Sequence, residues 1–256
     1  MLKQWIVDPT DVPWRDGLTE GIAFRGQVLF DGNDGGPEAF RFKFDPTPSV
    51  YAHMHLTPQF QVLLGGQMDL PRASMKLRPP AVHYTDHNRP YGPFAVSGEH
   101  EVLVLHPKKA GLISMGDKDA RRQINLKARE LSGMFKDIEW TQGPGNAGGR
   151  WKVLIRQREG PEALLLECPP NTLLAAGIPT HGRYEVVVEG SVLVDGRLLK
   201  RPSLRYVVGD ELAEPLTIGE EGASIMHFSF DSDALEGGLT GQGIAIAAAE
   251  AMARAI

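Results

Sequence analysis

Two histidines separated by a single residue are the strongest chemical signal in the sequence. His53 and His55 lie in the stretch HMHLTPQFQVLLGG (53–66), and Gln59 follows four residues after His55. Side chains two positions apart point to the same face of a β-strand, so both imidazoles would face one side of a sheet. Neutral imidazoles are common ligands of transition metals. The pattern predicts a metal site, with a hydrogen-bonded polar pocket as the alternative.

Three more histidines could supply a third imidazole to this pair. His83 stands between Val82 and Tyr84 in a run typical of a strand, so we favour it. His87 lies in a polar stretch and is expected in solvent, while His106 ends a later apolar run. The sequence leaves open which of these three histidines completes the site.

An internal repeat indicates what positions the histidines. The segment GPEAF at 36–40 reappears as GPEAL at 160–164, an offset of 124. After Gly66 the offset becomes 122, because a turn in the second copy is two residues shorter. Loop lengths vary in this way between related copies. A coherent series of matches over about 65 residues indicates a duplicated unit.

Both copies have the pattern of short strands joined by turns. The stretch AFRFKF at 39–44 alternates apolar and basic residues, as in a strand with one buried face. Asp195 and Gly196 separate two apolar segments and form a strong hairpin signal. With 29 glycines and 19 prolines to supply turns, the chain is predicted to form sandwiches or barrels.

The spacing around the histidine pair resembles the first motif of the cupin superfamily, G-(x5)-H-x-H-(x3,4)-E-(x6)-G. His53, His55 and Gly66 fit, but Thr47 replaces the first glycine and Gln59 replaces the glutamate. The glutamate's replacement removes a negative charge from the expected metal ligands.

The second cupin motif, G-(x5)-P-x-G-(x2)-H-(x3)-N, is matched only in part. Pro90, Tyr91 and Gly92 fit its P-x-G turn, and Ala95 then stands where the metal-binding histidine would be. On this alignment the metal site lacks one of its usual imidazoles.

The resemblance implies an all-β fold of two tandem cupin barrels (double-stranded β-helices, or jelly rolls). We expect an N-terminal barrel at 1–116, a linking helix at 117–134, a C-terminal barrel at 135–238 and a C-terminal helix at 239–256.

The resemblance also implies a metal-dependent enzyme acting on a small organic molecule. A non-haem, dioxygenase-like oxidation is preferred over isomerase or hydrolase chemistry, with one divalent Fe, Mn, Zn or Ni ion in the first barrel. Tyr84 and Tyr91 are candidate substrate contacts. The incomplete ligand set favours an alternative, a non-catalytic cupin that binds or senses a small molecule. The expected metal ligands are His53, His55, Gln59 and His83.

The second copy carries none of these ligand types. The repeat pairs His53 with Gly177, His55 with Pro179, Gln59 with Arg183, and His83 with Arg205. We therefore expect the second barrel to hold no metal. Its two arginines are expected to pair with Glu185 or Glu189 rather than to bind an anion.

The net charge, hydropathy and cysteine content limit the partners and the location that can be expected for the protein. A net charge of -5 argues against a dedicated nucleic-acid binder, and no apolar run is long enough for a membrane span. The one cysteine, Cys168, cannot form an intrachain disulfide, and a cytoplasmic location follows by default. The G-x-G-x-x-G stretch at 143–148 precedes an expected strand rather than a helix, so nucleotide binding is not expected there. Cupin analogy suggests a homodimer.

Overall fold

The computed structural model divides the chain into two compact units. One comprises Val12–Asp137, called here the first barrel, and the other comprises Met1–Asp11 with Ile138–Ile256, called the second barrel. Within the described part, strands dominate and the helices are single 3-10 turns. The fold class is therefore all-β, as predicted. The structure describes residues 4–19, 22–118, 120–142, 149–157, 160–174, 182–211 and 213–230.

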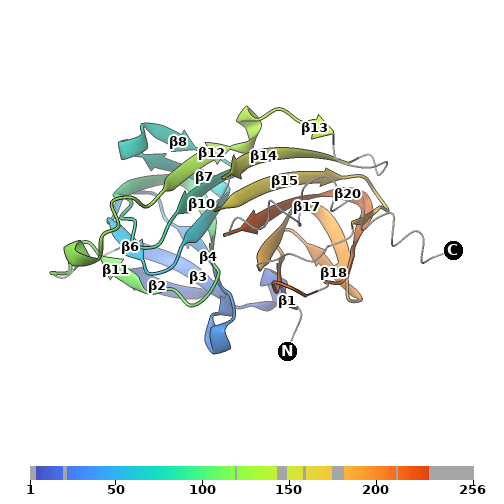
Figure 1. Ribbon diagram of the computed structural model, residues 1–256, viewed down its shortest axis with the longest axis horizontal. Coiled ribbons are helices and arrows are strands. Elements are labelled where there is room, and N and C mark those ends of the chain that lie inside the picture. The colour runs from blue at the N-terminus through green and yellow to red at the C-terminus, as the bar shows by residue number, and fades with distance from the viewer. Residues whose placement is uncertain are drawn as a thin grey trace. The chain divides into compact units, whose positions relative to one another are not determined.

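The first barrel is built on a nine-stranded antiparallel sheet with the order β12-β9-β7-β10-β4-β3-β2, to which β5 and β8 add (Figure 1). A separate two-stranded sheet pairs β6 with β11. The strands are β2 (Arg15–Thr19), β3 (Ile22–Asp31), β4 (Glu38–Phe44), β5 (Thr47–Val50), β6 (His53–His55), β7 (Gln59–Leu70), β8 (Met75–Leu77), β9 (Ala81–Thr85), β10 (Phe94–His106), β11 (Leu112–Ser114) and β12 (Glu130–Met134).

The second barrel repeats this path with the order β1-β19-β17-β20-β15-β14-β13, to which β16 and β18 add. Its strands are β1 (Gln4–Val7), β13 (Thr141–Gln142), β14 (Arg150–Arg156), β15 (Glu162–Cys168), β16 (Leu173–Leu174), β17 (Arg183–Val194), β18 (Arg197–Lys200), β19 (Leu204–Val207) and β20 (Leu216–Ser229). The 3-10 turns are Pro9–Asp11, Asn33–Gly35, Pro71–Ala73, Ala120–Gln123 and Phe135–Asp137.

The predicted duplication is confirmed strand by strand. Both ends of β15 lie 124 residues after those of β4, and both ends of β17 lie 124 residues after those of β7. Gly66 and Gly190 hold the same place in β7 and β17 with φ of 67° and 69°, a region that glycine enters without steric cost. A Cβ on Gly66 would approach the Ser97 carbonyl oxygen to 2.6 Å, so glycine is required there.

The expected linking helix at 117–134 is wrong. Apart from position 119, which is not described, this segment has the 3-10 turn Ala120–Gln123 and then strand β12, whose residue Ser132 pairs with His83 of β9. Gly133 disfavours a helix, and pairing with a strand far back in the chain outweighs a weak helical pattern. The expected C-terminal helix at 239–256 and the glycine-rich stretch at 143–148 lie outside the described residues.

The edges of the two sheets show a further difference from the expected boundaries. Strand β1 pairs with β19, so residues assigned by sequence to the N-terminal barrel belong to the second one. The equivalent edge of the first barrel is filled by β12, which follows the repeated strands of that barrel in the chain. In each case a segment from outside the repeat covers a strand edge that would otherwise expose unpaired backbone groups.

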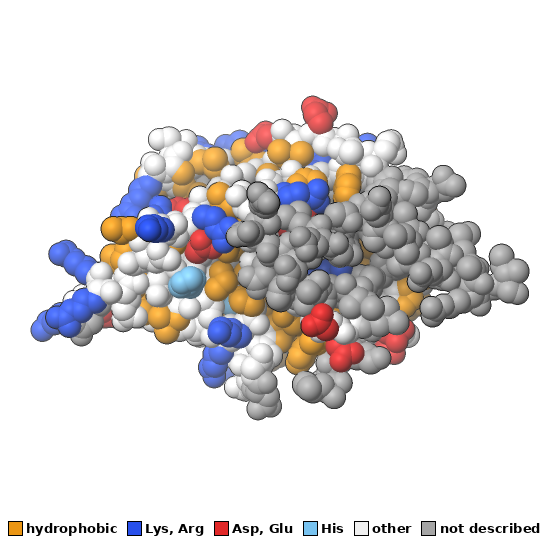
Figure 2. Space-filling model, viewed as in Figure 1, with side chains coloured by type: hydrophobic (Ala, Val, Ile, Leu, Met, Phe, Trp, Pro, Cys, Tyr) orange, Lys and Arg blue, Asp and Glu red, His pale blue; other side chains and the backbone are white. Residues whose placement is uncertain are grey.

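The surface shows no single dominant character where it is described. On the face in Figure 2, apolar side chains are scattered among acidic and basic ones. The larger exposed apolar residues include Leu126, which is 84% exposed. None of the helices in the described ranges reaches the length and hydropathy that a membrane crossing would need.

Candidate functional site

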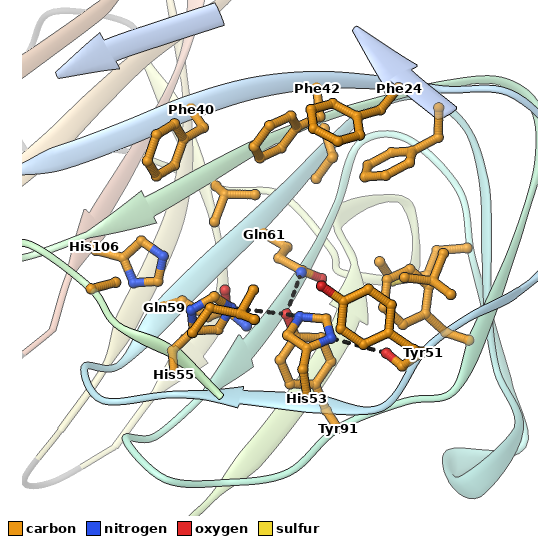
Figure 3. A pocket seen from close by; sticks show the side chains of 18 of the residues that line it. Phe24, Phe40, Phe42, Tyr51, His53, His55, Gln59, Gln61, Tyr91 and His106 are labelled. Atoms are coloured by element: carbon orange, nitrogen blue, oxygen red, sulfur yellow. Dashed lines mark hydrogen bonds between the residues drawn. The ribbon is translucent and has the colours of Figure 1, made fainter. Parts of the chain in front are cut away.

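A cavity of about 330 Å³ lies inside the first barrel. Phe24, Phe40 and Phe42 form one wall, while His53 and Tyr91 lie on the opposite side (Figure 3). The wall follows from the alternation in β4, because side chains two residues apart share a face. The cavity is therefore apolar along one side and polar along the other.

The two histidines of the motif point into this cavity together, as their spacing predicts. They lie on β6, and their ring centroids are 5.3 Å apart. The Nδ1 atom of His53 lies 2.9 Å from the carbonyl oxygen of Tyr51. Because a carbonyl only accepts, Nδ1 carries the proton and the lone pair of Nε2 faces the cavity.

The hydroxyl of Tyr91 lies where the two imidazoles converge. It is 2.5 Å from Nε2 of His53 and 3.4 Å from Nε2 of His55. The amide nitrogen of Gln61 donates to it at 3.0 Å. Because Nε2 of His53 lacks a proton, the Tyr91 hydroxyl donates to it. Burial raises the pKa of Tyr91 well above its usual range, so the phenol keeps this proton.

The two glutamines of β7 bring further oxygen atoms to the polar side. The amide nitrogen of Gln59 donates to the hydroxyl of Thr85 at 3.1 Å, just as that of Gln61 donates to Tyr91. The Oε1 atoms of both glutamines are buried and have no hydrogen-bond partner. Buried acceptors without donors are costly, and native structures contain few of them.

Structural comparisons place this architecture among known folds. No protein-family model matches the sequence, and no curated protein does either. Among solved structures, the chain resembles a proposed dioxygenase from Nostoc punctiforme (TM-score 0.68, 14% identity, covering 90% of this chain and 83% of that one). It also resembles an oxalate decarboxylase from Bacillus subtilis (0.60, 12%, 91% and 77%) and hazelnut vicilin (0.58, 8%, 90% and 86%).

The chain has a bicupin fold. Identities this low show the fold alone, and the names of these three proteins differ. The function of this bicupin must therefore be argued from the residues of its own site.

The cupin motif explains why Tyr91, rather than Ala95, meets the histidines. Asn88 adopts a left-handed φ of 57°, the conformation for which the glycine of the P-x-G turn is suited. Tyr91 follows three residues later, the spacing of the motif from glycine to histidine. Tyr91 therefore takes the place that the sequence alignment gave to Ala95, which does not line the cavity. The sequence signal was weak, because on this alignment Asp86 replaces the proline of the turn and Tyr91 replaces the histidine.

His83, the expected third imidazole, lies behind the cavity lining. It is fully buried on β9, and its Nδ1 atom lies 2.7 Å from the hydroxyl of Ser132. Its ring centroid is 5.3 Å from that of Tyr91, and its Nε2 atom has no hydrogen-bond partner. Burial, and then the neighbouring His53, lowers the pKa of His83 to about 3. Reaching the site would require movement of the Tyr91 ring.

Two histidines of β10 line the cavity instead. His106 lies with its ring 4.9 Å from that of His55, and its Nδ1 atom is 3.1 Å from the carbonyl oxygen of Pro58. His100 packs against Phe44 and was missed by the sequence analysis. The signal was available, because His100 and His106 lie an even number of residues apart on one strand. Burial lowers the pKa of each to about 4. His87 is exposed.

Of the two candidate substrate contacts, Tyr91 lines the cavity and Tyr84 does not. Tyr84 points the other way from β9, where it packs on Phe60 and donates to Asp86 at 2.6 Å. Its neighbour His83 faces Tyr91, as alternation along a strand requires.

The second cupin barrel carries charged groups at the equivalent positions. Glu185 lies 3.0 Å from Nε of Arg183 and 3.1 Å from Nε of Arg205, and all three side chains are buried. Burial alone would raise the pKa of Glu185, but the two arginines hold it below its usual value. The expected pairing of both arginines with Glu185 is confirmed.

The types of donor atom in the first barrel suit a divalent transition ion, but their positions do not form a complete coordination site. Imidazole nitrogens suit iron, nickel and zinc, and amide oxygens are weaker ligands. The unpartnered oxygens of Gln59 and Gln61 are acceptors that a cation would satisfy. Among the described residues, however, no group of three His, Cys, Asp or Glu side chains lies close enough to hold an ion. An ion here would rely on His53, His55 and neutral oxygens.

Proposed function

We propose that the first barrel holds one divalent transition metal between His53 and His55 and acts there on a small organic molecule by a dioxygenase-like oxidation. One observation carries this proposal: Gln59 and Gln61, whose buried Oε1 atoms have no hydrogen-bond partner, line the same cavity as His53, His55 and Tyr91. A cation or a proton-donating ligand would satisfy those acceptors.

The residues around the two histidines support such a role. The Tyr51 carbonyl fixes the tautomer and direction of His53, as second-shell acceptors commonly do for metal-binding histidines. Gln59 would offer its free amide oxygen in place of the motif's glutamate. A bound ion would supply Lewis-acid or redox chemistry at this point of the cavity. The phenylalanine wall would exclude water and orient the organic molecule.

Metal analysis of the purified full-length chain tests the proposal. We expect close to one equivalent of a transition metal after purification or after loading and desalting. The double variant His53→Ala plus His55→Ala should lose that metal, whereas His87→Ala, an exposed histidine in the same barrel, should retain it. Sub-stoichiometric metal that does not change in the double variant would overturn the metal-dependent reading.

A second candidate function is non-catalytic binding of a small molecule. It is favoured by the neutral donor set, in which no carboxylate stands beside the two imidazoles, and by the Tyr91 hydroxyl already bonded to His53. On this reading, ligand affinity should be the same before and after treatment with a chelator, and no turnover should follow metal loading. A ligand whose affinity depends on the metal would count against it.

A further inference from the structure

The lining of the first barrel also points to the chemical class of its ligand. We propose that it binds an uncharged, flat aromatic molecule that carries a hydroxyl group of the phenol or enol type. This inference rests on the proposed function, since it concerns the same cavity, but it does not require the metal to be bound.

The aromatic part of the ligand follows from the wall. Phe40, Phe42 and Phe44 lie in sequence along β4, with neighbouring ring centroids 5.6 and 5.9 Å apart, and Phe24 packs edge-on against Phe42 at 5.4 Å. Across the cavity the rings of Tyr91 and Phe94 stack at 6.0 Å. Aromatic surfaces on both sides favour a planar ring, because aromatic pairs gain stabilisation beyond the area they bury. The volume, about 330 Å³, suits one or two fused rings.

The absence of charge in the ligand follows from the titratable groups. No lysine or arginine is found among the described residues that line the cavity. Glu38, the one carboxylate of the lining, accepts from the amide of Ala110 and would repel an anion. A carboxylate or phosphate ligand would be buried without a partner cation, which is strongly unfavourable.

The hydroxyl group proposed for the ligand follows from the oxygens of Gln59 and Gln61. The hydrogen bonds run in one direction: His53 donates to Tyr51, Tyr91 donates to His53, and Gln61 donates to Tyr91. This direction leaves Oε1 of Gln61 as an acceptor without a partner, and Oε1 of Gln59 on the same strand is also unpartnered. A ligand hydroxyl aimed at this end would donate to one of these oxygens. Sites built to bond a hydroxyl discriminate strongly against analogues that lack it.

Calorimetry on the full chain, stripped of metal by a chelator, tests this with four probes of similar size. These are naphthol, naphthalene, decahydronaphthol and naphthoate. Naphthol should bind at least about tenfold more tightly than naphthalene, because of these two probes only naphthol can donate a hydrogen bond to a glutamine oxygen. Decahydronaphthol should bind about threefold more weakly than naphthol, and naphthoate should not bind measurably. Tighter binding of naphthoate than naphthol, or no binding of naphthol, would overturn the proposal.

Variants assign the effect to named side chains. Gln61→Met keeps the length of the side chain but removes the acceptor, so the difference between naphthol and naphthalene should shrink. Val104→Phe, which fills the cavity from β10, should weaken all bound probes together. Leu193→Ala, an exposed residue of the second barrel, is the control and should change nothing. The metal assay distinguishes this proposal from the proposed function. If the chain binds naphthol but no metal, only the proposed metal function is wrong. If it binds metal but not naphthol, only the proposed ligand class is wrong.

Discussion

The two barrels share one strand plan and differ in what they bury at its centre. Gln61 pairs across the sheet with His83 in the first barrel, and Glu185 pairs with Arg205 at the same register in the second. The first barrel has neutral polar groups beside a cavity, whereas the second buries charged groups that are joined in a triad, and both centres include buried polar atoms without a hydrogen-bond partner. Tyr91 of the first barrel corresponds to the small, buried Ala213 of the second.

This difference supports the proposal that the first barrel, rather than the second, binds a ligand. The charge of a buried carboxylate between two arginines is compensated by its own neighbours, so it needs no ligand cation. Neutral acceptors without donors are unsatisfied until something else arrives. The two copies therefore differ in that the central charges of the second barrel compensate one another, whereas the neutral centre of the first faces a cavity.

Removing the charge at the centre of the second barrel should have the largest effect on stability. Glu185→Gln keeps the shape of the side chain but leaves two buried guanidinium groups without their carboxylate. We expect a loss of about 3–5 kcal/mol in the free energy of unfolding, measured with urea. Glu189→Gln, on the same strand but exposed, should cost less than about 0.5 kcal/mol. A loss of equal size in both variants would contradict the role given to the buried triad.

Mild acid should act mainly on the first barrel. Burial lowers the pKa values of its histidines from the usual 6.5, to about 2 for His55, about 3 for His83 and about 4 for His100 and His106. The unfolded chain takes up protons below pH 6.5 while the folded barrel does not. The stability present above pH 6.5 is therefore lost as the pH falls toward these lower values.

Hydrogen exchange of the metal-free chain at pH 7 and pH 6 checks this, after correction for intrinsic rates. Four such groups should cost the first barrel about 2–3 kcal/mol over this interval, against less than about 1 kcal/mol for the second, whose described part contributes His227. The triad adds nothing here, because the pKa of Glu185 lies below 4.5. His100→Gln should reduce the loss in β9 and β10. An equal loss of protection in β9 and β19 would refute the contrast.

Much of this contrast could be predicted from sequence, and for physical reasons. The spacing of residues along β4 and β6 determines which side chains share a face. The structure confirms the repeat and the shared direction of His53 and His55, both of which were predicted from such spacing. The replacement of Gln59 and His83 by Arg183 and Arg205 correctly predicts a charged second centre. Each of these inferences depends on local spacing.

What could not be predicted depends on pairing between distant segments. Strand β12 replaces the expected helix because β9 leaves an edge to be paired, which no local pattern records. Tyr91 reaches His53 from a turn in which Asn88 takes a left-handed conformation, whereas the P-x-G turn found in the sequence (90–92) aligned Ala95 with the motif's histidine. The strand pattern around His83 was identified correctly. That His83 lies behind Tyr91 instead of lining the cavity depends on side-chain packing, which the sequence pattern does not show.

The Tyr91 hydroxyl offers a smaller test within the first barrel. Tyr91→Phe removes the group that bonds both His53 and Gln61, so we expect a loss of about 1–2 kcal/mol in the metal-free chain. Tyr84→Phe is the control, because Asp86 keeps its bonds to Arg129 when the Tyr84 hydroxyl is lost. It should cost less than about 1 kcal/mol. Urea unfolding of both variants gives the comparison, and a more stable Tyr91→Phe chain would show that the hydroxyl is not held as described.

The smallest expected difference lies on the outer faces of the barrels. Arg41 pairs with Glu101 at 2.8 Å in the first barrel, and Arg150 pairs with Glu167 at 2.8 Å in the second. The carboxylate of Glu101 is 16% exposed and also meets Lys43, whereas that of Glu167 is 41% exposed. The shortest nitrogen–oxygen distance is therefore the same in the two ion pairs, while the exposure of their carboxylates differs.

Exposed ion pairs are screened by water and salt, so the outer pairs should rank by burial. Glu101→Gln should lower the free energy of unfolding by about 1 kcal/mol, and Glu167→Gln by less than about 0.5 kcal/mol. Both arginines also lie over a tryptophan, Arg41 over Trp14 at 4.9 Å and Arg150 over Trp140 at 4.4 Å, so the cation–π contact is similar in the two. Urea unfolding in low and high salt separates the two variants. If salt abolishes the cost of Glu101→Gln as readily as that of Glu167→Gln, burial is not what distinguishes these faces.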